Sequence, residues 1–259
     1  MQLEVRTMAE LSEKNIIPDF LYWVGSAGSF DDRAKKITRA FVKILNYANV
    51  SFGVLGVEES TSGDVAKRAG NEFLFQMQAL ANIEVMNSYN IKKIITTCPH
   101  SFNILKNEYP DLGGNYELIH HTTLINNLVK DNKISITGGY YKGKKITYHD
   151  PCYLGRANGI YEAPRDVIKK LDAELIEMKS CKSKSLCCGA GGAQMFKEPE
   201  KGNQDINIKR AEEAINTDSE IVAVSCPFCN TMMSDGMTSK EKNINVLDIA
   251  QMIEKAEDL

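Results

Sequence analysis

Two adjacent cysteines stand at the head of a glycine-rich stretch, Cys187-Cys188-Gly189-Ala190-Gly191-Gly192. Glycine is used where the backbone approaches another group closely or needs a positive φ, and it is poor material for a core. A thiol pair beside such a loop indicates backbone wrapped around a metal ion or cluster. Three further cysteines flank the stretch: Cys152, Cys226 and Cys229. Five of the seven cysteines thus belong to one pattern, and a metal centre is the leading hypothesis.

The bulk properties are those of an ordinary globular protein. The chain has 259 residues, of which 43% are hydrophobic and 25% charged, and a net charge of −3. This length predicts one or two domains, and this charge gives no reason to expect binding to nucleic acid or to an anionic membrane.

The expected cellular location rests on two kinds of segment, a membrane span and a signal peptide. Its apolar runs are far shorter than the ~18 residues of a membrane span, and residues 1–6 have neither the basic start nor the apolar core of a signal peptide. We therefore expect a cytoplasmic protein without direct membrane insertion, peripheral to a membrane only through a partner. Disulfides are uncommon in the reducing cytosol, so clustered cysteines there favour metal binding or redox chemistry.

Alternating strands and helices predict an α/β fold. Strand-like runs lie at residues 20–24, 51–57, 93–97, 116–120, 145–149, 174–178, 221–224 and 246–247, and Gly25 to Gly28 read as the turn that ends the first. Helical patterns lie between them, including 70–89 and 206–215, the latter with Arg210 and Glu213 expected to point outward. Such alternation is typical of mainly parallel sheets flanked by helices.

Landmark residues recur at nearly one spacing. Ser26 and Thr61 lie 126 positions before Cys152 and Cys187, and Cys98 and Ser101 lie 128 positions before Cys226 and Cys229. The spacing predicts two pseudo-repeated lobes at residues 20–133 and 134–259, preceded by an N-terminal arm at 1–19. The landmark loops follow strands, where open α/β sheets normally bind ligands.

Three kinds of chemistry compete for the cysteines of the second half. An iron–sulfur cluster takes several thiolates, and neighbouring glycine N–H groups can hydrogen-bond to its sulfur atoms. A zinc site normally takes four nitrogen or sulfur ligands, fewer than the five thiols present. A thiol–disulfide enzyme would use Cys226 and Cys229 alone and leave the other three without a role.

The pattern C…CCG…CPxC resembles the cysteine-rich CCG domain found in the B-type subunit of heterodisulfide reductase and in related iron–sulfur oxidoreductases. The resemblance covers nearly the whole chain and includes the runs 22–25, 70–76, 106–110, 148–156 and 186–192. It implies two CCG-type halves and electron transfer beside flavin dehydrogenases or ferredoxin-like subunits. It also implies one [4Fe-4S] cluster, of the non-cubane kind, on Cys152, Cys187, Cys188, Cys226 and Cys229.

The first half departs from this family pattern. Where relatives carry cysteines, this chain has Ser26, Thr61 and Ser101, and only Cys98 remains. A serine hydroxyl is a poor ligand for iron or zinc, so we expect a degenerate first site that keeps its scaffold without a cluster. Cys98 is then either a remnant of the first-half site, without a function, or a free thiol near the complete site of the second half.

Four other residues are candidates for supporting that site. His149 is a candidate hydrogen-bond donor to a cluster sulfur, with a backbone-satisfied histidine as the alternative. Gly189 and Gly191 offer backbone N–H groups, and Cys181 is either a sixth thiol or a surface cysteine. The pair His120 and His121 is discounted as a metal site, because adjacent residues on a strand point to opposite faces.

Together these features predict an iron–sulfur electron-transfer subunit of an oxidoreductase. Its partners would be a flavoprotein dehydrogenase, an electron-transfer flavoprotein or a ferredoxin-type protein, and electrons would pass to a disulfide or another carrier. A zinc-binding structural or assembly subunit and a metal-free thiol–disulfide enzyme are the alternatives.

Overall fold

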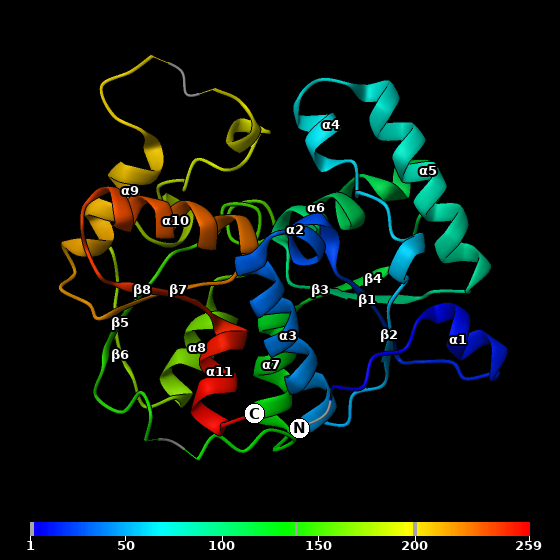
Figure 1. The fold of residues 1–259 in the computed structure, drawn as a ribbon, viewed down its shortest axis with the longest axis horizontal. Coiled ribbons are helices and arrows are strands. Elements are labelled where there is room, and N and C mark those ends of the chain that lie inside the picture. The colour runs from blue at the N-terminus through cyan, green and yellow to red at the C-terminus, as the bar shows by residue number, and fades with distance from the viewer. Residues whose placement is uncertain (1–2, 138, 199–200) are drawn as a thin grey trace.

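Two four-stranded parallel sheets form the framework of the chain (Figure 1). The computed structural model describes residues 3–137, 139–198 and 201–259. The first sheet has the order β2-β1-β3-β4 and the second the order β6-β5-β7-β8. The strands are β1 (Phe20–Trp23), β2 (Phe52–Gly53), β3 (Lys93–Thr96), β4 (Glu117–His120), β5 (Lys145–Tyr148), β6 (Glu174–Ile176), β7 (Ile221–Val224) and β8 (Asn245–Asp248).

The two sheets repeat one topology. In the first, Leu21 of β1 lies opposite Ile94 of β3, and in the second, Ile146 of β5 lies opposite Ile221 of β7. Each sheet places its third strand in sequence beside its first, as parallel crossover units require. The predicted α/β fold of two repeated halves is confirmed. The strand expected at 51–57 is shorter, because the chain leaves the sheet after Gly53 and forms a 3-10 turn at Gly56–Glu58.

The helices cover both faces of each sheet. They are α1 (Met8–Glu13), α2 (Gly25–Phe30), α3 (Asp32–Tyr47), α4 (Asp64–Arg68), α5 (Glu72–Ser88), α6 (Pro99–Asn107), α7 (His121–Lys130), α8 (Glu162–Lys170), α9 (Ile206–Ile215), α10 (Pro227–Ser239) and α11 (Ile249–Glu257). Local signals fix several ends: the Asp31 carboxylate accepts from the Ala34 N–H at the start of α3, and Asp248 forms a capping box on α11.

One helical layer is shared by the two halves. Helices α3 and α7 from the first half gather with α8 and α11 from the second below both sheets (Figure 1), and α3 packs on α11 while α7 packs on α8. A single hydrophobic cluster runs through this layer from Phe41 and Leu128 to Val167 and Ile253. The halves are therefore not separate globules, because each completes the core of the other.

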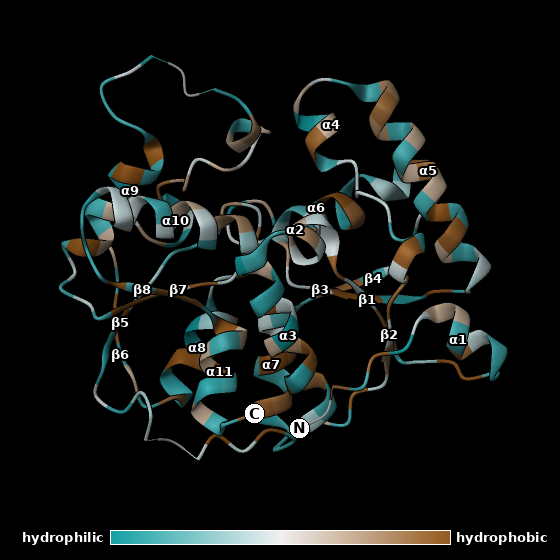
Figure 2. Ribbon diagram, in the orientation of Figure 1, coloured by the Kyte–Doolittle hydropathy of each residue, from teal (hydrophilic) through white to brown (hydrophobic). Residues whose placement is uncertain are grey.

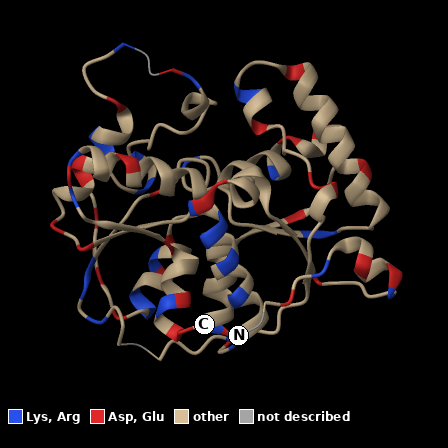
Figure 3. Cartoon of the chain, viewed as in Figure 1, with Lys and Arg blue, Asp and Glu red and all other residues tan. Residues whose placement is uncertain are grey.

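Hydrophobic and charged residues follow this layering. The central strands β1, β3, β5 and β7 are mostly buried, and β7 is hydrophobic throughout (Figure 2). Acidic and basic residues lie mainly in helices and loops (Figure 3). No helix within the described residues combines the length and the apolar character that crossing a membrane demands.

The N-terminal arm expected at 1–19 contains α1, whose Met8 and Leu11 are buried with residues of the first sheet. Two local expectations differ from the structure. Gly25 to Gly28 belong to helix α2 rather than a turn, since Glu59 accepts the N–H groups of Val24 and Gly25 and fixes the start of that helix. The expected outward position of Arg210 is wrong, because its side chain is fully buried.

Candidate metal centre

The five cysteines converge at the carboxyl edge of the second sheet. Cys152 lies in the loop after β5, and Cys187 and Cys188 lie in the long loop that follows β6. Cys226 is the N-cap of α10, directly after β7, and Cys229 lies in the first turn of that helix. Parallel strands end at one edge of the sheet, so residues distant in the sequence meet there.

Their sulfur atoms form a continuous chain of contacts. The Sγ atoms of Cys188 and Cys229 are 3.3 Å apart. Hydrogen-bond contacts also join Cys152 to Cys187, Cys187 to Cys188, and Cys226 to Cys229. The glycine loop contributes directly, because the Gly189 N–H donates to Cys187 Sγ at 3.3 Å. Gly189 has φ +89°, a conformation that favours glycine.

Burial and hydrogen bonding distribute negative charge unevenly over this set. Hydrogen bonds from Cys152 and Cys188 lower the pKa of Cys187 to about 2. Burial opposes ionisation of Cys226, yet hydrogen bonds from Cys229, Cys98 and His100 hold its pKa well below the usual value. The pKa values of Cys152, Cys188 and Cys229 are raised by the neighbouring sulfur atoms and by burial. The thiolate is the form of cysteine that binds metal, and the lowered pKa values of Cys187 and Cys226 favour this form.

His149 points a nitrogen toward these sulfur atoms. One ligand atom each from His149, Cys188 and Cys229 lie within 4.8 Å of one another. On the other side of the ring, His149 Nδ1 accepts a hydrogen bond from Arg210 Nε at 3.0 Å. Burial, followed by the positive charge of Arg210, lowers the pKa of His149 to about 3. The imidazole is therefore neutral.

The residues present fit an iron–sulfur cluster. Five thiols exceed the usual four ligands of zinc, and they lie in an apolar cluster with Met178, Met233 and Val224. His149 Nε2 and Arg210 Nη2 are two of the buried polar atoms that have no hydrogen-bond partner in the described part of the chain. Buried polar groups are normally paired, and these two nitrogen atoms fit a bound group that brings its own sulfur acceptors.

The first half builds the same loop from hydroxyl residues. Ser26, Thr61, Ser62, Cys98 and Ser101 line one small pocket between the lobes. Gly63 in this loop has φ +83°, matching Gly189 at the equivalent position of the second half. Ser62 was missed in the sequence, although the spacing of 126 that pairs Thr61 with Cys187 also pairs Ser62 with Cys188.

Protein hydrogen bonds hold this loop in place. The Tyr109 hydroxyl donates to the Ser62 carbonyl oxygen at 3.0 Å, and the Asn82 side-chain amide donates to the Thr61 carbonyl oxygen at 2.8 Å. Both donors are buried. The first half can therefore keep its loop geometry without thiolate ligands.

The two sites face each other across the lobe interface. Cys98 of the first half is buried and in hydrogen-bond contact with its counterpart Cys226. His100 bonds to Asp64 at 3.1 Å, and hydrogen bonds to Asp64 and Cys226 outweigh burial and raise its pKa to about 9. Its ring lies 5.1 Å from that of Phe228, its own counterpart. The contact between His100 and Cys226 therefore favours the protonated imidazole and the ionised thiol.

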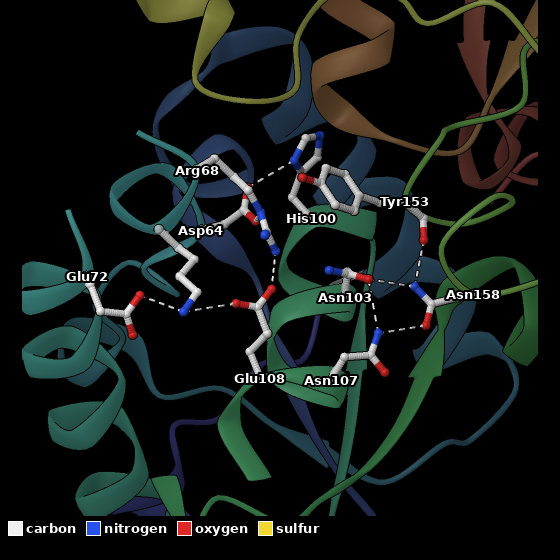
Figure 4. A network of polar contacts seen from close by, with 10 residues as sticks. Asp64, Arg68, Glu72, His100, Asn103, Asn107, Glu108, Tyr153 and Asn158 are labelled. Atoms are coloured by element: carbon white, nitrogen blue, oxygen red, sulfur yellow. Dashed lines mark hydrogen bonds and ion pairs between the residues drawn. The ribbon is translucent and has the colours of Figure 1, made fainter. Parts of the chain in front are cut away.

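A polar network fixes this interface (Figure 4). Asn158 donates to the side chain of Asn103 at 3.0 Å and to the Tyr153 carbonyl oxygen at 2.7 Å, and it accepts from Asn107. The Tyr153 ring, one residue after Cys152, packs 4.7 Å from the His100 ring. The loop that carries Cys152 is thereby attached to helix α6 of the first half.

The remaining candidates occupy different environments. Gly191 lies where the lobes approach, and a Cβ there would be 3.6 Å from both His100 and Tyr153. Cys181 is partly exposed. Burial, followed by the charge of Glu177, raises the pKa of its thiol, and the other groups that affect this pKa include Arg165 and Asp150 but no cysteine of the site. The premise used to discount His120 and His121 is wrong, because β4 ends at His120, α7 begins at His121, and their rings lie 4.4 Å apart. His121 instead bonds to Asp248 at 2.9 Å.

Duplicated α/β halves, with five cysteines gathered at the edge of the second sheet, define a cysteine-rich protein with a candidate metal site. The chain belongs to the CCG cysteine-rich domain family, whose model matches residues 21–106 and 146–234. One matched segment lies in each half of the chain, in keeping with the repeated fold.

Three relatives extend this assignment. The chain is 41% identical over 253 residues to "Probable iron-sulfur-binding oxidoreductase FadF" of Bacillus subtilis, covering 96% of this chain and 36% of the relative. It is 42% identical over 256 residues to "EtfAB:quinone oxidoreductase" of Syntrophomonas wolfei, covering 93% and 36%. It is 31% identical over 245 residues to a dihydromethanophenazine:CoB--CoM heterodisulfide reductase subunit of Methanosarcina barkeri, covering 92% and 59%. The chain thus spans 36% of the first two relatives.

One solved structure shares the fold. A hypothetical protein from Helicobacter pylori superposes with a TM-score of 0.56 over 92% of this chain and 48% of that one, at 8% identity. At this identity the similarity concerns the fold alone.

Proposed function

We propose that this chain is an iron–sulfur electron-transfer unit of an oxidoreductase, with one cluster held by Cys152, Cys187, Cys188, Cys226 and Cys229. The observation that carries the proposal is the continuous contact of these five sulfur atoms in a buried, apolar site. The relatives named as an iron–sulfur-binding oxidoreductase, an EtfAB:quinone oxidoreductase and a heterodisulfide reductase subunit support it.

The cofactor is a single [4Fe-4S] cluster of the non-cubane kind, which would supply reversible electron storage. The protein contributes thiolate ligands, the Gly189 N–H, and an apolar shell that limits water access. The first half contributes support, since Cys98 and His100 contact Cys226 while its remaining site residues are hydroxyls.

The electron donor is a flavoprotein, such as an electron-transfer flavoprotein or a flavin dehydrogenase, or a ferredoxin-type protein. The acceptor is a disulfide or another carrier. Pro227 and Phe228, which lie between Cys226 and Cys229 in the sequence, line a pocket bordered by α2 and the loop after Gly192, and this pocket is the proposed side of approach for the partner. Membrane association, where present, is peripheral and depends on a partner.

Anaerobic redox titration tests this function. We expect the purified, cluster-loaded protein to show a visible and EPR spectrum that changes reversibly on reduction by one electron per chain and returns on oxidation. A zinc protein would have no such spectrum, and a thiol–disulfide enzyme would take two electrons without metal. Either of those results would contradict the proposed function.

A further inference from the structure

The side chain of Arg210 is placed in the interior beside the thiolate site. It is fully buried on α9, which packs against α10, the helix that carries Cys229. Its Nη1 donates to the Ser180 carbonyl oxygen at 2.8 Å and pairs with Glu213 at 2.5 Å. Its Nε donates to His149 Nδ1 at 3.0 Å. Three contacts therefore fix the guanidinium in one orientation.

This orientation determines which nitrogen of His149 carries the proton. An arginine Nε always carries a hydrogen and can only donate, so His149 Nδ1 must present its lone pair. In a neutral imidazole the proton is then on Nε2, which is buried and has no partner among the described residues. A ring nitrogen of His149 lies within 4.8 Å of the sulfur atoms of Cys188 and Cys229, and because Arg210 occupies Nδ1, Nε2 is the nitrogen left to contact them. An Nε2 that carries a proton cannot bind a metal.

We propose that Arg210 is a positioning residue that locks His149 in the Nε2–H tautomer, so that His149 donates a hydrogen bond to a sulfur atom of the cluster and is not a ligand. This inference rests on the proposed function. It assigns a role to Arg210, which makes no hydrogen bond to any of the five cysteines. It also decides between the two arrangements that the proximity of His149, Cys188 and Cys229 allows.

A donated hydrogen bond affects the reduced cluster more than the oxidised one. Reduction adds negative charge to the sulfur atoms, and an N–H donor stabilises that charge in a buried site. Without the hydrogen bond from Arg210, the proton of His149 can move to Nδ1. Nε2 then presents a lone pair to the sulfur atoms in place of an N–H donor. The cluster then becomes harder to reduce.

The direct test is pulsed EPR of the reduced wild-type protein labelled with ¹⁵N-histidine. We expect only the weak nitrogen coupling of an N–H donor to sulfur. A strong coupling of the size given by a ligating imidazole would overturn the proposal. A sample with no iron–sulfur EPR signal would overturn the proposed function as well, so the two failures are distinguishable.

Variants provide the second test. Arg210→Lys keeps the charge but has a methylene where arginine has Nε, so the hydrogen bond to His149 Nδ1 is lost. We expect unchanged iron and about a tenfold smaller equilibrium constant for one-electron reduction, which corresponds to a reduction potential about 59 mV more negative. Lys209→Met, which removes an exposed charge one residue earlier on α9, should leave the potential unchanged. His149→Phe should keep its iron and shift the reduction potential in the same direction. Adding Arg210→Lys to His149→Phe should change the potential little further. Loss of iron in His149→Phe, or full additivity of the two substitutions, would contradict the proposed role.

Discussion

Replacing Cys188 with alanine is expected to remove most of the bound iron and sulfide from the purified protein. Cys188 is 3% exposed and lies in contact with Cys229 and Cys187, at the centre of the chain of sulfur atoms. Removing it divides that chain into two pairs, Cys152 with Cys187 and Cys226 with Cys229. Neither pair alone offers enough thiolates for a multi-iron cluster. Iron and sulfide analysis after anaerobic purification measures the effect.

Cys98→Ala and Cys181→Ala are the matched controls for this substitution. Cys98 is as deeply buried as Cys188 and contacts Cys226, but it belongs to the first-half pocket, where hydroxyls replace the other thiols. Cys181 is partly exposed. Both controls should retain nearly full iron. Equal iron loss in Cys98→Ala and Cys188→Ala would show that the assignment of a degenerate first site is wrong.

The second large effect is expected from Arg165→Met, at the ion pair that supports the Cys152 loop. Arg165 donates to both carboxylate oxygens of Asp150, at 2.7 and 2.8 Å, and to Glu177 at 2.6 and 2.9 Å. Both side chains of the Arg165–Asp150 pair are 2% exposed. Removing one partner of such a buried pair leaves an uncompensated charge and costs about 3–5 kcal/mol.

Urea denaturation measures this cost in free energy of unfolding. Lys182→Met is the control, since the side chain of Lys182 pairs with Glu162 at the surface and a surface pair contributes at most about 1 kcal/mol. The Lys182 N–H that donates to Asp150 remains in this control. A loss in Arg165→Met no larger than in Lys182→Met would contradict a supporting role for the buried pair.

The repeat in the sequence predicted the fold because the repeat is visible in local patterns of strands, helices and the loops between them. The spacings of 126 and 128 depend on where strands end, and the strand order is the same in both sheets. The same repetition brings Cys98 opposite Cys226 and His100 opposite Phe228, contacts that the linear spacing alone does not reveal. They arise from packing of the two halves on one helical layer.

Charged residues in the interior were the part that sequence patterns could not predict. A helical pattern assigns an arginine to the solvent face, yet Arg210 is buried because Glu213, Ser180 and His149 satisfy its donors. The partly buried Glu59 also has partners distant in the sequence: the N–H groups of Val24 and Gly25 donate to its carboxylate, and burial raises its pKa to about 7. Such partners are distant in the sequence, and only the fold brings them together.

The most direct test of a single cluster in the second half is the iron, sulfide and zinc content of anaerobically purified protein. We expect about four iron and about four sulfide per chain, with little zinc, as one [4Fe-4S] cluster requires. About one zinc per chain without iron would contradict the iron–sulfur assignment. About eight iron per chain would contradict the degenerate first site, since Ser26, Thr61 and Ser101 would then have to support a second cluster.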